Sequence, residues 1–141
     1  MSPELERKLS AWVPAVAWTV LIFCVSSIPG IAPIIFRFKF FDKLAHAIEY
    51  AGLGIFLTIA YRGSLPRGAR LSAAALLAVA TGLAIAVADE AYQLTVPGRA
   101  VEFHDWVADA TGVVLGSLIM VYCYRRVVPW AARVAERLER G

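Results

Sequence analysis

The chain has 141 residues, of which 60% are hydrophobic and only 18% are charged. Ordinary soluble domains are roughly half apolar, so this composition excludes that class, and the length suits one domain. The formal net charge is +3. Most of the basic residues lie between or after apolar stretches, a pattern that reports membrane orientation and gives no support to nucleic-acid binding.

Four apolar stretches approach the length of about 20 residues that crosses a bilayer. The sequence therefore predicts an all-α, four-helix transmembrane bundle that forms a single domain over residues 1–141. The predicted order is a polar arm (1–10), four spans (11–28, 42–61, 71–94 and 105–124) with loops between them (29–41, 62–70 and 95–104), and a basic amphipathic tail (125–141). The first span also resembles a signal peptide, but its length favours an uncleaved anchor.

The distribution of lysine and arginine predicts the orientation of the bundle. Ten of these residues lie in the N-terminal arm, the 62–70 turn and the tail, whereas four lie near the other two loops. The positive-inside rule then places both termini in the cytoplasm, and the tail is expected along the membrane surface. Cys24 and Cys123 would lie at opposite ends of the spans, too far apart for a disulfide.

Charged residues gather at the span ends that face away from the termini. Seven of the eleven acidic residues lie there: Asp42, Glu49, Asp89, Glu90, Glu102, Asp105 and Asp109. They are joined by Lys43, His46, Gln93, Arg99 and His104. Asp42 and His46 are four residues apart, as are Asp105 and Asp109, so each pair shares a helix face. Three segments thus bring acid, base and imidazole to one level of the membrane.

Local signals add detail to this arrangement. Gly112 and Gly116 continue the stripe of Asp105 and Asp109, and such a small-residue pair predicts close approach of another helix. Asp42 and Asp105 are interpreted as N-caps of the second and fourth spans. Because charge inside a bilayer is costly, ionisable groups there favour a functional site by default. An ion-pair network that only fixes the helix register is the structural alternative.

Several chemistries suit these residues. Carboxylates with imidazole could hold a divalent cation, although no metal-binding signature is present. General acid–base catalysis by Glu90, Asp109 or His46 is equally compatible with the pattern. Arg99, followed by Asp105 and Asp109, resembles in spacing the Arg-x5-His-x3-Asp element of membrane lipid-phosphate phosphatases, which points to anion handling. Ser26 and Ser27 are interpreted as helix-end hydrogen-bonding residues.

An ordered set of residues resembles the VanZ-like family over about residues 20–120. It comprises Ser26-Ser27-x-Pro29, Asp42-Lys43-x-x-His46-x-x-x-Tyr50, Glu90-x-x-Gln93, Pro97-Gly98-Arg99, Asp105, Gly112 and Gly116. Asp109 departs from it, because many members have Asn there. The resemblance implies a multi-pass protein of the bacterial plasma membrane, in a family whose founding member is linked to resistance to the glycopeptide teicoplanin.

The leading hypothesis is an outward-facing pocket that binds, and also modifies, an anionic envelope lipid or lipid-linked cell-wall precursor. The candidate catalytic residues are His46, Glu90, Asp105 and Asp109. The candidate ligand-binding residues are Asp42, Lys43, Tyr50, Gln93 and Arg99. A non-enzymatic scaffold or binding protein is the alternative, and a transporter is third, since four spans are few unless the chain oligomerises. Enzymatic activity, the cofactor and the oligomeric state remain open.

Overall fold

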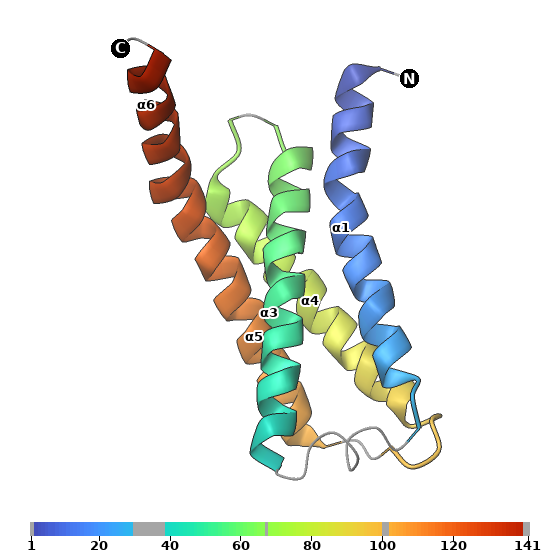
Figure 1. The fold of residues 1–141 in the computed structure, drawn as a ribbon. Coiled ribbons are helices and arrows are strands. Elements are labelled where there is room, and N and C mark those ends of the chain that lie inside the picture. Colours follow the sequence, from blue (N-terminus) through green and yellow to red (C-terminus); the bar gives the residue numbers. More distant parts are fainter. Residues whose placement is uncertain (1, 30–38, 67, 100–101, 140–141) are drawn as a thin grey trace.

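The computed structural model describes residues 2–29, 39–66, 68–99 and 102–139. These residues form helices and turns without a strand, in the order α1 (Pro3–Ser26), α3 (Lys39–Ser64), α4 (Leu71–Gln93), α5 (Phe103–Tyr122), a π-helical turn (Cys123–Val127) and α6 (Val128–Glu139). Four of the helices described are long and apolar enough to cross a membrane. The predicted all-α fold with four transmembrane helices is therefore confirmed, and both termini lie at the same end of the bundle (Figure 1).

The outside of the bundle is apolar. Leu76 on α4 and Leu118 and Ile119 on α5 are each more than half exposed. Large apolar side chains that face outward along whole helices would be unfavourable in water, whereas lipid chains solvate them without penalty. The surface therefore agrees with the hydropathy of the helices in assigning the chain to a membrane.

The first and second spans begin earlier than predicted. α1 starts at Pro3, because Ser2 caps it through its side-chain oxygen, which accepts from the Leu5 N–H at 3.3 Å. Pro3 occupies the first helical position, where its fixed φ is favourable. Residues 3–10, which the sequence analysis assigned to a polar arm, are therefore helical and continue directly into the first span.

The N-cap assignments of the two aspartates were also wrong. α3 begins at Lys39, so Asp42 lies within its first turn. Glu102 occupies the N-cap position of α5, and Asp105 lies in the first turn of that helix. Negative charge in a first turn still complements the helix dipole, which explains why both positions resemble caps in the sequence.

α3 is the central helix and contacts α1, α4 and α5 (Figure 1). Its approach to α5 is backbone to backbone: a Cβ at Gly112 would overlap the Ala47 carbonyl oxygen, and one at Gly116 would overlap that of Ala51. The close approach expected from the two glycines is confirmed, and α3 is the partner. Since neither glycine has a side chain, the polar groups one turn away are drawn together.

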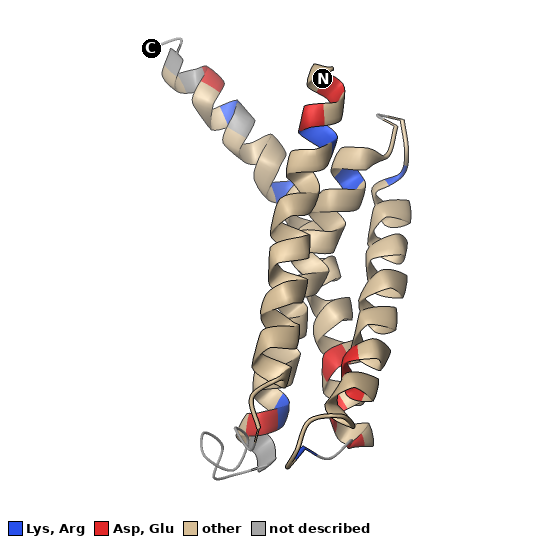
Figure 2. Cartoon of the chain, turned by 90° about the vertical axis from the view of Figure 1, so that its right-hand side faces the viewer, with Lys and Arg blue, Asp and Glu red and all other residues tan. Residues whose placement is uncertain are grey.

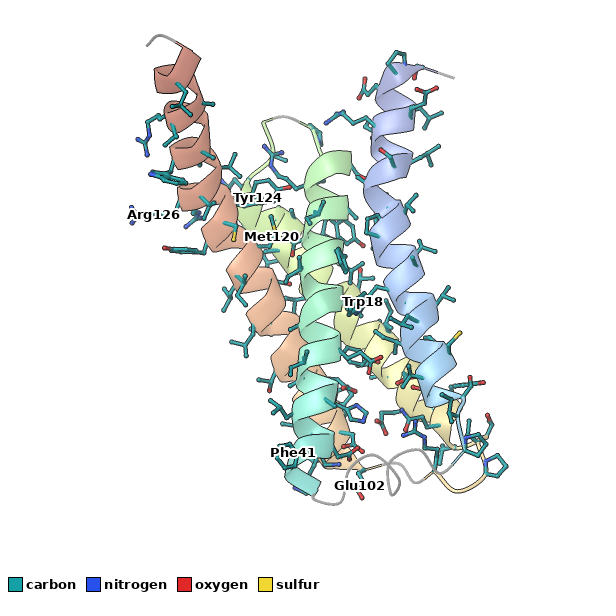
Figure 3. The ribbon with its side chains drawn as sticks, viewed as in Figure 1. Trp18, Phe41, Glu102, Met120, Tyr124 and Arg126 are labelled. Atoms are coloured by element: carbon teal, nitrogen blue, oxygen red, sulfur yellow. The ribbon has the colours of Figure 1, made fainter. Side chains whose placement is uncertain are left out.

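Two tryptophans of α1 donate hydrogen bonds to α3. The indole N–H of Trp18, which lies between the two helices in Figure 3, donates to the Glu49 carbonyl oxygen at 2.8 Å. Trp12 donates to the Ser64 Oγ at 2.8 Å, nearer the termini. Both hydrogen bonds satisfy an indole N–H that would otherwise be buried without a partner. They hold the end of α1 beside the polar residues of α3 and α4.

α6 continues from α5 beyond the bundle through the π-helical turn. Its exposed side chains include Val128, Trp130, Val134 and Leu138 alongside Arg133, in agreement with the amphipathic pattern of the tail. The position of this helix on a membrane surface stays a prediction.

Candidate functional site

Charged side chains cluster at the end of the bundle opposite the termini, which we call the acidic end (Figure 2). It is formed by the start of α3, the end of α4 and the start of α5, with the end of α1 beside them. Its carboxylates come from residues that are far apart in the sequence: Asp42 and Glu49 on α3, Asp89 and Glu90 on α4, and Glu102, Asp105 and Asp109 at or after the α5 cap. The three segments singled out by the sequence thus meet in space.

Lys43 lies between three carboxylates. Its ammonium nitrogen is 2.9 Å from Glu102 Oε2 and 3.2 Å from Asp42 Oδ2, and it also donates to Asp105 Oδ1. These ion pairs join α3 to α5 at the very end of the bundle, and Figure 3 shows Glu102 beside the start of α3. An incoming anion would have to compete with three carboxylates for Lys43, so its predicted role as an anion contact receives no support.

His46 and Asp109 form a pair one turn deeper. His46 Nδ1 lies 2.9 Å from Asp109 Oδ1, and Asp109 is fully buried. The other ring nitrogen of His46 makes no hydrogen bond with the described residues. A carboxylate on one imidazole nitrogen fixes the ring and its tautomer, which leaves the second nitrogen to take or give a proton. The pair thus places an oriented imidazole one turn inside the acidic end.

A second polar cluster joins α1 to α4. The Ser26 hydroxyl donates to Asp89 Oδ2 at 2.9 Å, and the Gln93 amide donates to the same oxygen at 3.0 Å. The Tyr50 hydroxyl is buried near Asp89 but forms no hydrogen bond of ordinary geometry. Gln93 is therefore held by Asp89, which the sequence put in the charged cluster but not among the candidate site residues. Its four-residue spacing from Gln93 was the available signal.

Arg99 lies apart from Lys43 and caps the end of α1. Its Nη2 donates to the Val25 carbonyl oxygen at 3.1 Å, while its buried Nε has no partner in the described part of the chain. Gly98, with φ of 79°, makes the turn that carries Arg99 back toward α1. His104 lies in the first turn of α5, where its exposed side chain packs against the Phe103 ring.

Several buried oxygens of the acidic end have no hydrogen-bond partner among the described residues. They are both carboxyl oxygens of Glu90, Oδ2 of Asp109, Oδ1 of Asp89 and the Tyr50 hydroxyl. Buried polar atoms in native proteins are nearly always satisfied by protein or ordered water. So many unsatisfied acceptors at one level indicate a place where water or a polar ligand supplies the missing donors.

One group of side chains has the spacing of a metal site. Asp42, His46 and Asp105 each offer a ligand atom, and these atoms lie within 4.8 Å of one another. Oxygen and imidazole ligands suit zinc or manganese. The Lys43 ammonium, however, already neutralises two of these three residues. These residues could hold a divalent cation only when that ammonium moves aside.

Most candidate site residues thus fall into three groups, which are the Lys43 ion pairs, the His46–Asp109 pair and the Asp89 cluster. Glu90 and Arg99 belong to none of them. Comparison with curated proteins finds no match, and comparison with solved structures finds none. The model of the VanZ/LLP1 family matches residues 5–124. Because this match runs from the first turns of α1 to the end of α5, the chain belongs to the VanZ/LLP1 family.

Proposed function

We propose that the acidic end binds, and modifies, the head group of an anionic envelope lipid or lipid-linked cell-wall precursor. The observation that carries this proposal is the His46–Asp109 pair, in which a fully buried carboxylate orients an imidazole with one nitrogen left open. Ionisable groups inside a membrane cost stability, and such groups are therefore functional candidates by default. The positive-inside rule would turn this end toward the cell exterior, where envelope precursors are used.

Each group then has a distinct part in the reaction. Asp109 holds Nδ1 of His46, so that the other ring nitrogen can accept a proton from water or from a head-group hydroxyl. Glu90, with both oxygens unsatisfied, is the second proton carrier. Arg99 is the better candidate for the anion contact, because its guanidinium bonds a carbonyl oxygen and no carboxylate among the described residues.

The test uses the purified full chain in nanodiscs made from a bacterial envelope lipid extract. Native mass spectrometry and lipid analysis would report a retained lipid and any product that forms with time. We expect His46→Gln to retain the lipid but lose the product, and Arg99→Gln to lose both. His104→Gln is the matched control, since that exposed imidazole packs against the Phe103 ring on the outside of the helix start. A wild-type protein that neither retains nor converts a lipid would overturn the proposal.

The Lys43 ion pairs favour a second candidate, a non-enzymatic scaffold. They cross from α3 to α5 and would hold the helix register without any ligand. The exchange Lys43→Asp with Asp105→Lys keeps this pair in reversed order. A scaffold would keep its cellular effect in the double variant and in His46→Gln, whereas a catalytic site would lose it in His46→Gln.

Family membership extends the proposal to glycopeptide susceptibility. The measurement is the minimal inhibitory concentration of teicoplanin for bacteria that express the wild-type chain or His46→Gln at equal membrane levels. A higher minimal inhibitory concentration with the wild-type chain alone would connect the site to resistance. No rise with either protein would remove antibiotic resistance from the proposal and leave the lipid chemistry to be judged by the nanodisc experiment.

A further inference from the structure

A groove opens sideways between α4 and α5 near the acidic end. Its volume is about 400 Å³, and it is lined by Val87, Glu90, Glu102, Phe103 and Trp106. Val87 and Phe103 are largely exposed on the apolar outside of the bundle. The groove therefore faces the lipid, and a molecule in the membrane could enter it without passing through water. Neither His46 nor Arg99 lines it.

Glu90 is the distinctive feature of this groove. Its side chain is only 6% exposed, and neither carboxyl oxygen has a hydrogen-bond partner among the described residues. The Lys43 ammonium forms its ion pairs with Asp42, Glu102 and Asp105 instead. A buried carboxylate without hydrogen-bond donors is unfavourable, and an incoming cation that donates hydrogen bonds removes that cost.

The aromatic wall suits the same ligand. Phe103 and Trp106 stack with ring centroids 6.0 Å apart and an interplanar angle of 28°. The indole N–H of Trp106 is buried and has no partner within the described part of the chain. Aromatic faces attract ammonium groups, and a free indole N–H donates to a phosphate or ester oxygen. The groove thus offers an acceptor for a cation, a donor for an oxygen and an apolar channel for a tail.

We propose that this groove binds a membrane amphiphile whose head carries a primary ammonium group, as an aminophospholipid does, with the ammonium on Glu90 and the tail against Val87 and Phe103. Charge complementarity selects this occupant, because the described lining residues include no basic side chain, and Glu90 brings two carboxyl oxygens without a partner, whereas Glu102 is paired with Lys43. A purely anionic lipid would meet these carboxylates unfavourably. A quaternary ammonium could contact the rings but could not donate hydrogen bonds to Glu90. The inference goes beyond the proposed reaction, with which this groove shares Glu90 but neither His46 nor Arg99.

The test is native mass spectrometry of the full chain with phosphatidylethanolamine, phosphatidylglycerol and phosphatidylcholine that carry identical acyl chains. We expect phosphatidylethanolamine to be retained about tenfold more tightly than the other two, the scale of one hydrogen-bonded charge pair. Free ethanolamine in a parallel arm should bind far more weakly, because it lacks the tail. Equal retention of the three lipids, or preference for phosphatidylglycerol or phosphatidylcholine, would overturn the proposal. It would also be overturned if free ethanolamine displaced phosphatidylethanolamine when the two are present at equal concentrations.

Three variants make the site assignment specific. Glu90→Gln should abolish the preference for the primary amine, whereas Glu49→Gln, a half-buried glutamate on α3 that does not line the groove, should keep it. Val87→Trp should block the groove from the lipid side without changing any charge, so it tests the site even if Glu90→Gln does not fold. A preference that survives Val87→Trp would contradict binding in the groove. Loss of product in His46→Gln with the preference intact would separate this site from the proposed reaction.

Discussion

Asp109 Oδ1 lies 2.9 Å from His46 Nδ1, and this pair sits beside the close contact of α3 with α5. Gly112 follows Asp109 by three residues and fits against the backbone of Ala47, the neighbour of His46. The missing side chain at Gly112 therefore sets the separation of the two helices at the level of the pair. The packing of α3 against α5 therefore also determines the geometry of the His46–Asp109 pair.

Gly112→Ala should consequently disturb both. A Cβ at this position would overlap the Ala47 carbonyl oxygen, which is backbone and cannot rotate away. Overpacking of this kind costs about 1–3 kcal/mol, so we expect a lower melting temperature in detergent. Gly68→Ala is the control, because nothing lies within 4 Å of a Cβ there. An unchanged melting temperature in Gly112→Ala would mean that α3 and α5 are farther apart than described.

Asp109→Asn should separate the structural role of the pair from its chemical role. Asparagine has the same shape and can still accept a hydrogen bond from a neutral imidazole, so the chain should fold. It lacks the charge that stabilises a protonated ring, and the proposed product formation should fall by about 10²-fold or more. Melting temperature and product yield are measured on the same preparation. A folded variant with full product yield would show that the carboxylate at this position is dispensable.

Lys43→Met should convert the outermost ion pairs into a site for a divalent cation. Removal of the ammonium leaves Asp42, His46 and Asp105, with ligand atoms within 4.8 Å of one another, without their present counter-ion. Ligand binding to the folded state at 100 times its dissociation constant adds about 2.7 kcal/mol of stability. We therefore expect zinc or manganese to raise the melting temperature of Lys43→Met well above any effect on the wild type.

The control for this experiment is Lys43→Met combined with Asp42→Asn, which removes one ligand and should reduce the shift. Equal stabilisation of the wild type and Lys43→Met would show instead that the metal binds without displacing Lys43. In that case a divalent cation would return as a candidate cofactor of the native protein.

The sequence sufficed to predict the features that depend on composition and on spacing within one helix. Hydropathy predicted four apolar helices, and the Gly112–Gly116 spacing predicted a close helix contact, now seen with α3. Helix starts were less predictable, because Asp42 and Asp105 resemble caps although their helices begin three and two residues earlier, respectively. A first-turn carboxylate and a cap carboxylate satisfy the same helix dipole, so composition cannot separate them.

Contacts between helices were beyond the sequence. The Ser26 hydroxyl bonds Asp89 across 63 positions of chain, and nothing in the spacing of either residue indicates the other. Lys43 could have paired with any carboxylate at its level, yet it bonds Asp42, Glu102 and Asp105 rather than Glu90. The partner depends on how α3 rotates against α5, which the glycine contacts determine in three dimensions. This rotation leaves Glu90 unsatisfied on the groove side.

The sidedness of the acidic end gives the last prediction. Both termini lie at the opposite end, where ten of the fourteen lysines and arginines belong to the arm, the 62–70 turn and the tail. Since basic loops remain in the cytoplasm, we expect a cysteine at Thr95, an exposed residue beside the acidic end, to react with a membrane-impermeant maleimide on whole cells. A cysteine at Ser2 should react only after the cells are lysed. Both variants require a background with Cys24 and Cys123 replaced, because both are free thiols. The reverse labelling pattern would place His46, Asp109 and the groove at the cytoplasmic leaflet, and the proposed substrate would then have to be sought among lipids of that leaflet.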